Sequence, residues 1–343
     1  MYNRRLSLFL IVSFLSVPFP FSTLAERPNK RANQPMPREA LDLSSIPYRI
    51  VNESFRETKG KENWELCIMN ADGSNQVNIT QTPDIDEMYP HASPDGKRIC
   101  FVTDEWRESG KVRSVYYMNV DGSGRVKVSD HARQPCWNPS GTAIAYMKAE
   151  FEEYTTKDYA TRGLFIYDLA TGESRQHVNE DLHHLYNICW SPDGNWFLAT
   201  VHGGMGFKHA ILTFPAAEGT VYDLTRFWVK GCRPEFSPDG KRITWGASDH
   251  DICTAEIDFT GEAPTVRKVH TLIHCQDEWE TYHADFSPDG KYIAFSYGPE
   301  AEEIVGGKAP GWNICVADMD GNWVQITTDG LQNKEPDWIP TAP

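Results

Sequence analysis

The stretch Phe236–Trp245, FSPDGKRITW, returns 50 residues later as FSPDGKYIAF at Phe286–Phe295. Four related segments complete the series: HASPDGKRICF from His91, CWNPSGTAIAY from Cys136, CWSPDGNWFLA from Cys189 and the truncated PDWIP from Pro336. A segment that recurs along a chain indicates a structural unit used several times, whereas an active site needs only one copy.

A second motif alternates with the first and places a short Gly-containing turn between two apolar stretches. Its six copies are WELCIMNADGSNQVNIT from Trp64, VYYMNVDGSGRVKVS from Val115, LFIYDLATGESRQHV from Leu164, AILTFPAAEGTVYDLT from Ala210, ICTAEIDFTGEAPTVRKV from Ile252 and WNICVADMDGNWVQIT from Trp312. Each pair of motifs predicts four short strands, because alternating apolar residues flank Pro-Asp-Gly and Asp-Gly turns. Six four-stranded repeats predict an all-β, six-bladed β-propeller.

The two ends of the chain complete each other. The first repeat begins at its second strand, YRIVNESF from Tyr48, while EPDWIP at Glu335–Pro340 is a first strand with nothing after it. We therefore expect the C-terminal strand to complete the N-terminal blade and close the ring, which leaves no open sheet edge.

Residues 1–25 are typical of a secretory signal peptide, with Arg4 and Arg5 before a short apolar run and Thr23-Leu24-Ala25 as a cleavage site. We expect a polar segment at 26–45, the propeller at 46–343, and a periplasmic or secreted monomer. No apolar run is long enough to span a membrane. Removal of the signal would take the formal net charge from −15 to −17, which argues against nucleic acid as a partner.

The eight cysteines predict buried thiols more than disulfides. Six lie inside predicted strands, where cysteine acts as a small apolar residue: Cys67, Cys100, Cys136, Cys189, Cys253 and Cys315. Cys232 and Cys275 lie in neighbouring loops, so a bridge between them is left open.

The paired motifs, WSPDG followed by IAF and IY followed by DG and LT, resemble the propeller repeat of the TolB-like proteins. The resemblance covers Pro47 to Pro340 and implies the fold rather than a function. TolB proteins carry an α/β domain ahead of the propeller, used in contacts with their Tol partners. Here about twenty residues separate the predicted signal from the first blade, so the resemblance extends to the propeller without that domain.

The two faces of the predicted ring differ. The uniform SPDG and Asp-Gly turns form a lower face, whereas long, dissimilar loops, such as DEWRESGKVR from Asp104, and most histidines fall on the opposite, upper face. Aromatic, polar and charged side chains there predict a ligand site at the mouth of the central channel. The expected ligand-binding residues are Tyr89, His91, Gln134, His184, Asn187, Lys230, Trp279, Glu280, Lys334 and Glu335.

Two functions fit this mouth. The first is a non-catalytic module that binds a carbohydrate, a peptide or an envelope protein. The second is a polysaccharide lyase: oligogalacturonate lyases have a similar propeller, with seven blades rather than six, and use manganese held by histidines and a glutamine. A lyase needs a cation beside the uronate carboxylate and a base that removes the adjacent proton.

The residues for a lyase are predicted from their types alone. His283 or Tyr282 would be the base, with Arg233 and Arg133 as catalytic cations and Lys230 and Lys334 adding positive charge. His91, His274, Gln276 and His283 would hold manganese or zinc. A serine peptidase is set aside, because the sequence has no G-x-S-x-G stretch.

Overall fold

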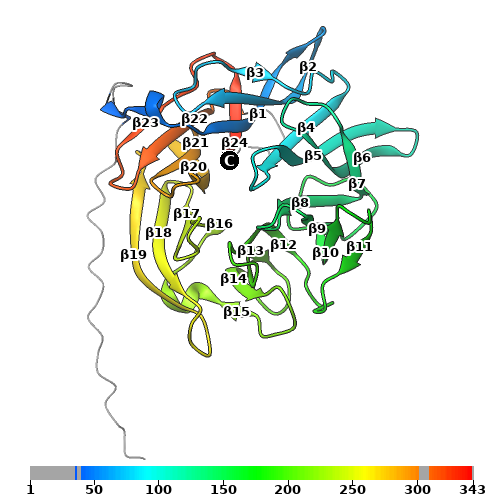
Figure 1. Ribbon diagram of the computed structural model, residues 1–343, viewed down its shortest axis with the longest axis vertical. Coiled ribbons are helices and arrows are strands. Elements are labelled where there is room, and N and C mark those ends of the chain that lie inside the picture. The colour runs from blue at the N-terminus through cyan, green and yellow to red at the C-terminus, as the bar shows by residue number, and fades with distance from the viewer. Residues whose placement is uncertain (1–34, 37–39, 301–308, 342–343) are drawn as a thin grey trace, which may run out of the picture.

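The structure is a computed structural model that describes residues 35–36, 40–300 and 309–341. Six four-stranded antiparallel sheets form a ring, as Figure 1 shows. The predicted all-β, six-bladed propeller is confirmed. The predicted signal peptide lies outside the described residues, as does most of segment 26–45. No helix in the described part of the chain is long and apolar enough to cross a membrane.

Each blade runs from an innermost strand at the channel to an outermost strand. Blade 1 consists of β24 (Gln332–Ile339), β1 (Arg49–Thr58), β2 (Lys61–Asn70) and β3 (Val77–Asn78). Blade 2 consists of β4 (Ile85–Ala92), β5 (Arg98–Arg107), β6 (Gly110–Asn119) and β7 (Val126–Asp130). Blade 3 consists of β8 (Ala132–Trp137), β9 (Ala143–Ala149), β10 (Thr161–Asp168) and β11 (Ser174–Gln176). Blade 4 consists of β12 (Leu185–Trp190), β13 (Trp196–His202), β14 (His209–Pro215) and β15 (Tyr222–Asp223). Blade 5 consists of β16 (Cys232–Phe236), β17 (Arg242–Ser248), β18 (Asp251–Asp258) and β19 (Thr265–His274). Blade 6 consists of β20 (Trp279–Phe286), β21 (Tyr292–Pro299), β22 (Asn313–Asp318) and β23 (Trp323–Gln325). Two 3₁₀ turns, η2 (Leu43–Ser45) and η3 (Leu224–Phe227), lie outside the sheets.

The repeated SPDG segment is a turn held by its own side chains. In blade 5 the Ser237 hydroxyl donates to Asp239 (2.6 Å) and accepts from the Arg242 amide (2.9 Å). The Asp239 carboxylate accepts from the Lys241 amide at 3.0 Å. The same serine–aspartate bond recurs at Ser93, Ser191 and Ser287. The turns are therefore architecture, as the repetition predicted.

The lower turns also connect the blades to one another. The glycine of each turn faces the proline of the turn before it, in the pairs Gly141–Pro94, Gly194–Pro139, Gly240–Pro192 and Gly290–Pro238. Gly96 completes the series by facing Pro340, the proline of the truncated copy. The lower face is thus a chain of nearly equivalent contacts between blades.

Closure of the ring follows the predicted split blade. Strand β24 pairs antiparallel with β1, and Figure 1 shows the red C-terminal strand beside the blue N-terminal one. Trp338 on β24 is buried, and its indole donates to the Asp285 carbonyl of blade 6 at 3.2 Å. The C-terminal strand therefore joins blades 1 and 6.

The core lies between adjacent blades. Leu198 and Ile211 of blade 4, for example, pack in one cluster with Ile243 and Trp245 of blade 5. The six cysteines expected to be small apolar residues are all buried. Cys232 and Cys275 are both free thiols, so the bridge left open by the sequence is not formed.

One predicted upper loop is mostly strand. The segment from Asp104 to Arg113 pairs along its length as the end of the β5–β6 hairpin, with Trp106 opposite Lys111. The run of charged residues resembles a loop in sequence, but the two strands pair residue by residue up to the turn after Arg107.

Candidate functional site

Six equivalent backbone positions line the upper part of the central channel. Each innermost strand carries one non-glycine residue with φ between +46° and +58°: Tyr89, Gln134, Asn187, Arg233, His283 and Glu335. We call these residues the upper tier. The strand register shifts at each of them, which marks a β-bulge. In four blades the next residue is proline, which bulges tolerate because it has no N–H for the ladder.

The left-handed conformation is costly for a side chain, on the order of 1 kcal/mol at each position. Hydrogen bonds donated by the backbone N–H groups of these residues hold this conformation. The Tyr89 amide donates to Glu53 (3.0 Å), the Asn187 amide to the Gln134 side chain (2.8 Å) and the Arg233 amide to the Thr200 hydroxyl (2.8 Å). Each of these bonds joins two adjacent blades.

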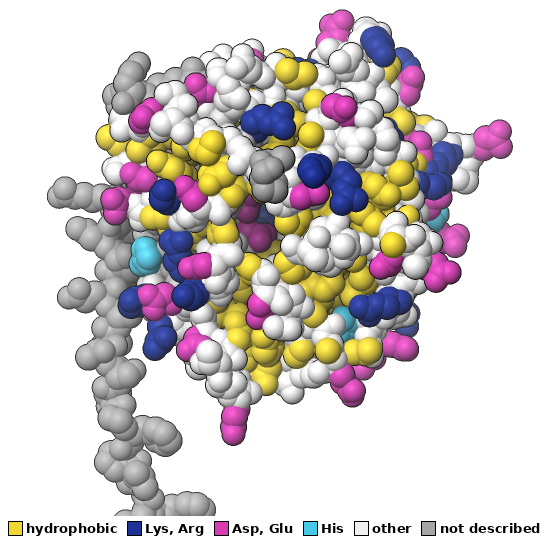
Figure 2. All heavy atoms as spheres, in the orientation of Figure 1, with side chains coloured by type: hydrophobic (Ala, Val, Ile, Leu, Met, Phe, Trp, Pro, Cys, Tyr) yellow, Lys and Arg dark blue, Asp and Glu magenta, His cyan; other side chains and the backbone are white. Residues whose placement is uncertain are grey.

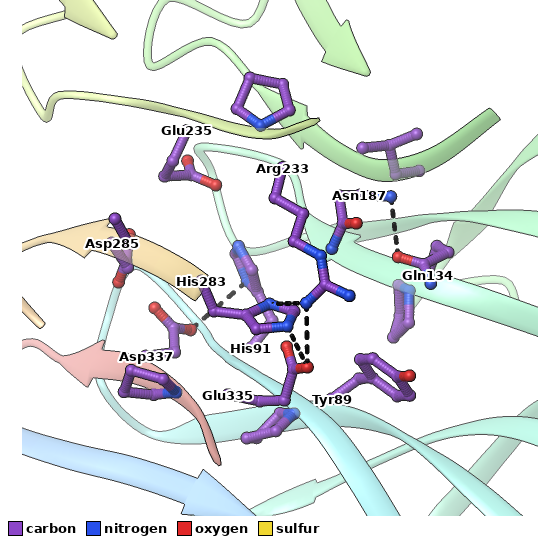
Figure 3. Close-up of a pocket in the computed structure, with 16 residues that line it drawn as sticks. Tyr89, His91, Gln134, Asn187, Arg233, Glu235, His283, Asp285, Glu335 and Asp337 are labelled. Atoms are coloured by element: carbon purple, nitrogen blue, oxygen red, sulfur yellow. Dashed lines mark hydrogen bonds and ion pairs between the residues drawn. The ribbon is translucent and has the colours of Figure 1, made fainter. Parts of the chain in front are cut away.

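Two residues further along each strand lies a second ring, the lower tier, composed of His91, Cys136, Cys189, Glu235, Asp285 and Asp337. Four of these, His91 and the three carboxyl groups, line the channel cavity of about 100 Å³ together with the upper tier (Figure 3). Figure 2 shows a hollow near the middle of the viewed face, with acidic side chains (magenta) inside it. The channel is thus acidic at its lower tier.

A buried charged triad occupies one side of the upper tier. The Arg233 guanidinium donates to His283 Nδ1 at 2.9 Å and lies 3.4 Å from the Glu335 carboxylate, which also pairs with His283 Nε2. Burial, followed by the charges of Arg233 and Lys334, holds the pKa of His283 well below its usual range. The imidazole is therefore neutral at pH 7: Nδ1 accepts from Arg233, and the proton lies on Nε2, next to the Glu335 carboxylate.

The lower tier contains carboxyl groups that share a proton. The Asp285 carboxyl is hydrogen-bonded to Asp337, and burial and the Asp337 charge raise the pKa of Asp285 well above its usual range. Burial raises the pKa of Asp337 to about 6 and, with the charge of Asp285, holds the pKa of Glu235 well above its usual range. Burial also lowers the pKa of His91, whose Nδ1 lies 3.9 Å from Asp337. Near pH 6 this tier therefore exchanges protons.

The structure brings together only some of the residues predicted for the mouth. Tyr89, His91, Gln134, Asn187, Arg233, His283 and Glu335 line the channel as expected. His91, however, lies near the lower end of β4, because that strand begins at Ile85 and carries the residue down the channel.

Two of the predicted mouth cations are buried instead. Arg133 is 2% exposed and donates to the carbonyls of Lys157 (2.6 Å) and Thr155 (3.1 Å), so it anchors the loop at 150–160. Lys334 is 2% exposed and lies 3.9 Å from Glu53, over the Trp64 ring. Neither lines the channel cavity.

The remaining predicted residues lie around the channel rather than in it. Trp279 stacks on Tyr297 at 4.7 Å, and Glu280 beside it is half-buried. Lys230 is exposed, with its ammonium 5.1 Å from the Trp228 ring. His184 bonds to Glu150 at 3.1 Å.

The four predicted metal ligands do not form a metal site. His274 Nδ1 bonds to Asp251 at 2.8 Å, Gln276 is exposed, and both nitrogens of His283 are engaged by the triad. Within the described ranges, no three His, Cys, Asp or Glu side chains are placed to hold one ion. The residues present do not fit manganese or zinc, and no chemistry is assigned to a metal here.

An adjoining groove on the upper face was not predicted. It has a volume of about 470 Å³ and shares Arg233 with the channel. Tyr159 stacks on His202 at 4.4 Å, and the Tyr186 hydroxyl bonds to His209 at 3.0 Å. Further lining residues include Lys157, Asp158, Asp249 and Tyr282.

The Tyr282 hydroxyl donates to Asp249 at 2.8 Å, and its ring stacks on Trp312 at 5.4 Å. The Arg233 guanidinium carbon lies 5.3 Å from the centre of the same ring. Tyr282 therefore connects the charged triad to the wall of the groove.

Sequence reasoning also missed the three carboxyl groups of the lower tier. Glu235, Asp285 and Asp337 each stand two residues after an upper-tier residue and just before the aromatic residue of the repeat, in RPEF, HADF and EPDW. Aligning the six copies residue by residue would have shown this position. Tyr159 lies in the loop before β10, and His202 and His209 end β13 and begin β14 on either side of a loop that does not repeat, so no such signal exists for them.

Comparison with solved structures gives the fold a place among known proteins. TolB from Acinetobacter baumannii superposes with a TM-score of 0.63 and 20% identity, over 86% of this chain and 67% of that chain. Hydrazine synthase from Kuenenia stuttgartiensis gives 0.59 and 13%, over 86% and 47%, and a chain of a nidogen/laminin complex gives 0.58 and 8%, over 86% and 100%. No protein-family profile matches the chain, and neither does any curated protein. This likeness establishes the fold: the chain is a TolB-like six-bladed β-propeller.

Proposed function

We propose that this protein is an exported binding module that holds a segment of a peptide or envelope protein on its upper face. The observation that carries the proposal is the continuity of the groove with the charged channel through Arg233. A concave surface with aromatic walls and a few convergent polar groups is the usual form of a binding site.

A peptide fits this surface better than a glycan. Sugars bind to free aromatic faces, but the rings here are stacked on neighbouring side chains: Tyr159 on His202, Tyr282 on Trp312 and Trp279 on Tyr297. Charges of both signs, from Lys157, Asp249 and the triad, suit the charged side chains and amide groups of a polypeptide.

The lyase hypothesis receives no support from the position of its predicted base. His283 Nδ1 accepts from Arg233, so the proton of the neutral imidazole lies on Nε2, which faces Glu335. Its imidazole therefore has no free lone pair with which to remove a substrate proton. The Tyr282 hydroxyl is likewise directed at Asp249.

Selection of random dodecapeptides displayed on phage tests the proposal. We expect the selected peptides to bind the wild-type protein, and Tyr159→Ala and His209→Ala to weaken them at least tenfold. The matched control is Lys97→Ala, an exposed residue of a lower turn, which should leave affinity unchanged.

The same proteins would be titrated with chitohexaose and with oligogalacturonate. Binding of either sugar without any selected peptide would contradict the peptide assignment. Peptides whose affinity follows Lys97 rather than Tyr159 would place the site on the lower face. Appearance of an unsaturated uronate from oligogalacturonate would favour the lyase.

A further inference from the structure

We propose that the lower tier of the channel binds one organic cation, the ammonium or guanidinium group of a basic residue of the bound peptide. This inference rests on the proposed function and names the group that the channel recognises. The argument has three steps: the charge of the lower tier, the unpaired polar atoms above it, and the length of the channel.

The first step is the charge. Glu235, Asp285 and Asp337 come from three different blades and converge on one cavity (Figure 3). In the described part of the chain, no Lys or Arg side chain forms an ion pair with any of them. Buried carboxyl groups are normally matched by a cation. Here protons on Asp285 and Glu235 and the neutral neighbour His91 stand in its place, and Asp337 is the carboxyl group that ionises above pH 6.

The second step concerns polar atoms in the upper tier that have no partner. Gln134 is 5% exposed and lines the cavity, yet its Nε2 donor has no hydrogen-bond partner. Asn187, on the innermost strand of the next blade, has an unpartnered buried Oδ1 acceptor. One free donor beside one free acceptor matches the C=O and N–H of a peptide group.

The third step is the length of the channel. The two tiers are two residues apart along each strand, or roughly 6 to 7 Å at the usual rise of about 3.3 Å per residue. The stem of a lysine or arginine side chain is of that length. A peptide group bound by Gln134 and Asn187 would thus place its cationic group among the three carboxyls.

The upper tier does not prevent the entry of a cation. Arg233 is the one cation of the upper tier, and its charge is balanced by Glu335, while His283 between them is neutral. The incoming group therefore passes a nearly neutral ring to reach an acidic one. The cavity of about 100 Å³ has room for one such group and not for a folded segment.

Calorimetry with two small probes of nearly equal shape tests the inference. Nα-acetyl-lysine methylamide carries the cation, and Nα-acetyl-norleucine methylamide has the same four-carbon chain without the terminal ammonium. We expect the lysine probe to bind wild-type protein at pH 8 at least tenfold more tightly than the norleucine probe. This comparison needs no variant, so it does not depend on the folding of any mutant.

Variants then locate the site. Asp337→Asn and Glu235→Gln should each weaken the lysine probe at least tenfold. The control Asp320→Asn removes the same charge from an exposed lower turn and should have no effect. An equal loss with Asp320→Asn would show a general charge effect and overturn the proposal, as would equal binding of both probes or no binding of the lysine probe.

The pH gives an independent readout. The groups that face Asp337 are Asp285, His91 and Glu235, and Glu235 is hydrogen-bonded in turn to the Cys189 thiol. A cation favours ionised carboxyls, so binding near pH 6 should release protons, and affinity should fall at least fivefold from pH 8 to pH 5. Proton uptake instead of release would contradict the site.

The phage-selected peptides separate this inference from the proposed function. If Tyr159→Ala weakens them and Asp337→Asn does not, the groove stands as the binding site and the channel inference fails. If neither substitution weakens them, both fail. If both do, and the peptides share a basic residue whose replacement by norleucine has the same effect, both hold.

Discussion

The lower and upper ends of the six innermost strands differ in how similar they are from blade to blade. At the lower end, four of the six blades build the same turn from serine, aspartate and glycine, and the glycine of each turn faces a neighbour's proline. At the upper end, one backbone conformation is equally well repeated, with φ near +50° in every blade, but six different side chains occupy it. The fold therefore repeats its backbone at both ends and varies its chemistry at only one.

The difference is also energetic. The lower turns satisfy their polar groups locally and stabilise the ring. The tiers instead hold left-handed side chains and buried carboxyls, both of which cost stability unless neighbouring groups or a ligand offset them. Such sites are where function is expected.

Removal of the closing strand β24 should have the largest effect on stability, because that strand carries part of both the upper and the lower end of the channel. Deleting residues 331–343 removes β24, with Glu335 of the upper tier and Asp337 of the lower tier, and exposes the edge of β1. We expect insoluble protein or no cooperative unfolding transition in thermal melts. Deleting only residues 342 and 343 is the control and should leave the transition intact. A shorter chain that melts like the full one would contradict the split blade.

The second prediction compares one lower turn with another. Gly96 and Gly240 have almost the same φ, +66° and +67°. A Cβ on Gly96 would lie 2.0 Å from the Pro340 carbonyl oxygen, whereas at Gly240 the nearest atom is 3.6 Å away. Gly240→Ala should cost about 1 kcal/mol for the strained φ alone.

Gly96→Ala should cost at least about 3 kcal/mol, because the closing strand would have to shift. Urea unfolding of the two variants measures the difference. Equal losses would show that the end of β24 moves freely and that the turn at Gly96 makes no tight contact with it.

The third prediction concerns pH. Burial raises the folded-state pKa of Asp337 to about 6, so folding favours its protonated form. The associated stability is present below the unfolded pKa of about 4 and is lost as pH rises through about 6. Wild-type protein should therefore lose roughly 1 to 1.5 kcal/mol between pH 5 and pH 8 relative to Asp337→Asn. Urea unfolding at both pH values, with Asp320→Asn as the control, measures this; parallel pH profiles would disprove the buried carboxyl pair.

The smallest effect on stability should come from the groove. Tyr159→Ala removes a stacked pair with His202 on the surface, worth about 0.5 kcal/mol. The melting temperature should change by only about 1 or 2 °C, while binding of selected peptides falls. A large drop in melting temperature would mean that the groove supports the fold in the same way as the lower turns.

Much of the fold could be read from the sequence because its signals are local. Pro-Asp-Gly turns and alternating strands depend on neighbours a few residues apart, so the six blades, the four strands of each and the closure at Glu335–Pro340 followed from the printed letters. Seven of the predicted site residues also line the channel. The hairpin at Asp104–Arg113 does not follow the sequence prediction, because a run of charged residues resembles a loop although Asp104 and Arg113 pair with each other and are buried.

By itself, then, the sequence determined the ring, its closure and which end of each strand varies, since all three depend on short-range turn chemistry. Only the tertiary structure decided which varied residues meet. Asp337 reaches Asp285 and His91 because closure of the ring brings together strands that are far apart along the chain. It also decided that Arg133 and Lys334 are buried away from the channel. The direction of a side chain at a bulge depends on the neighbouring blade, and no local pattern records that neighbour.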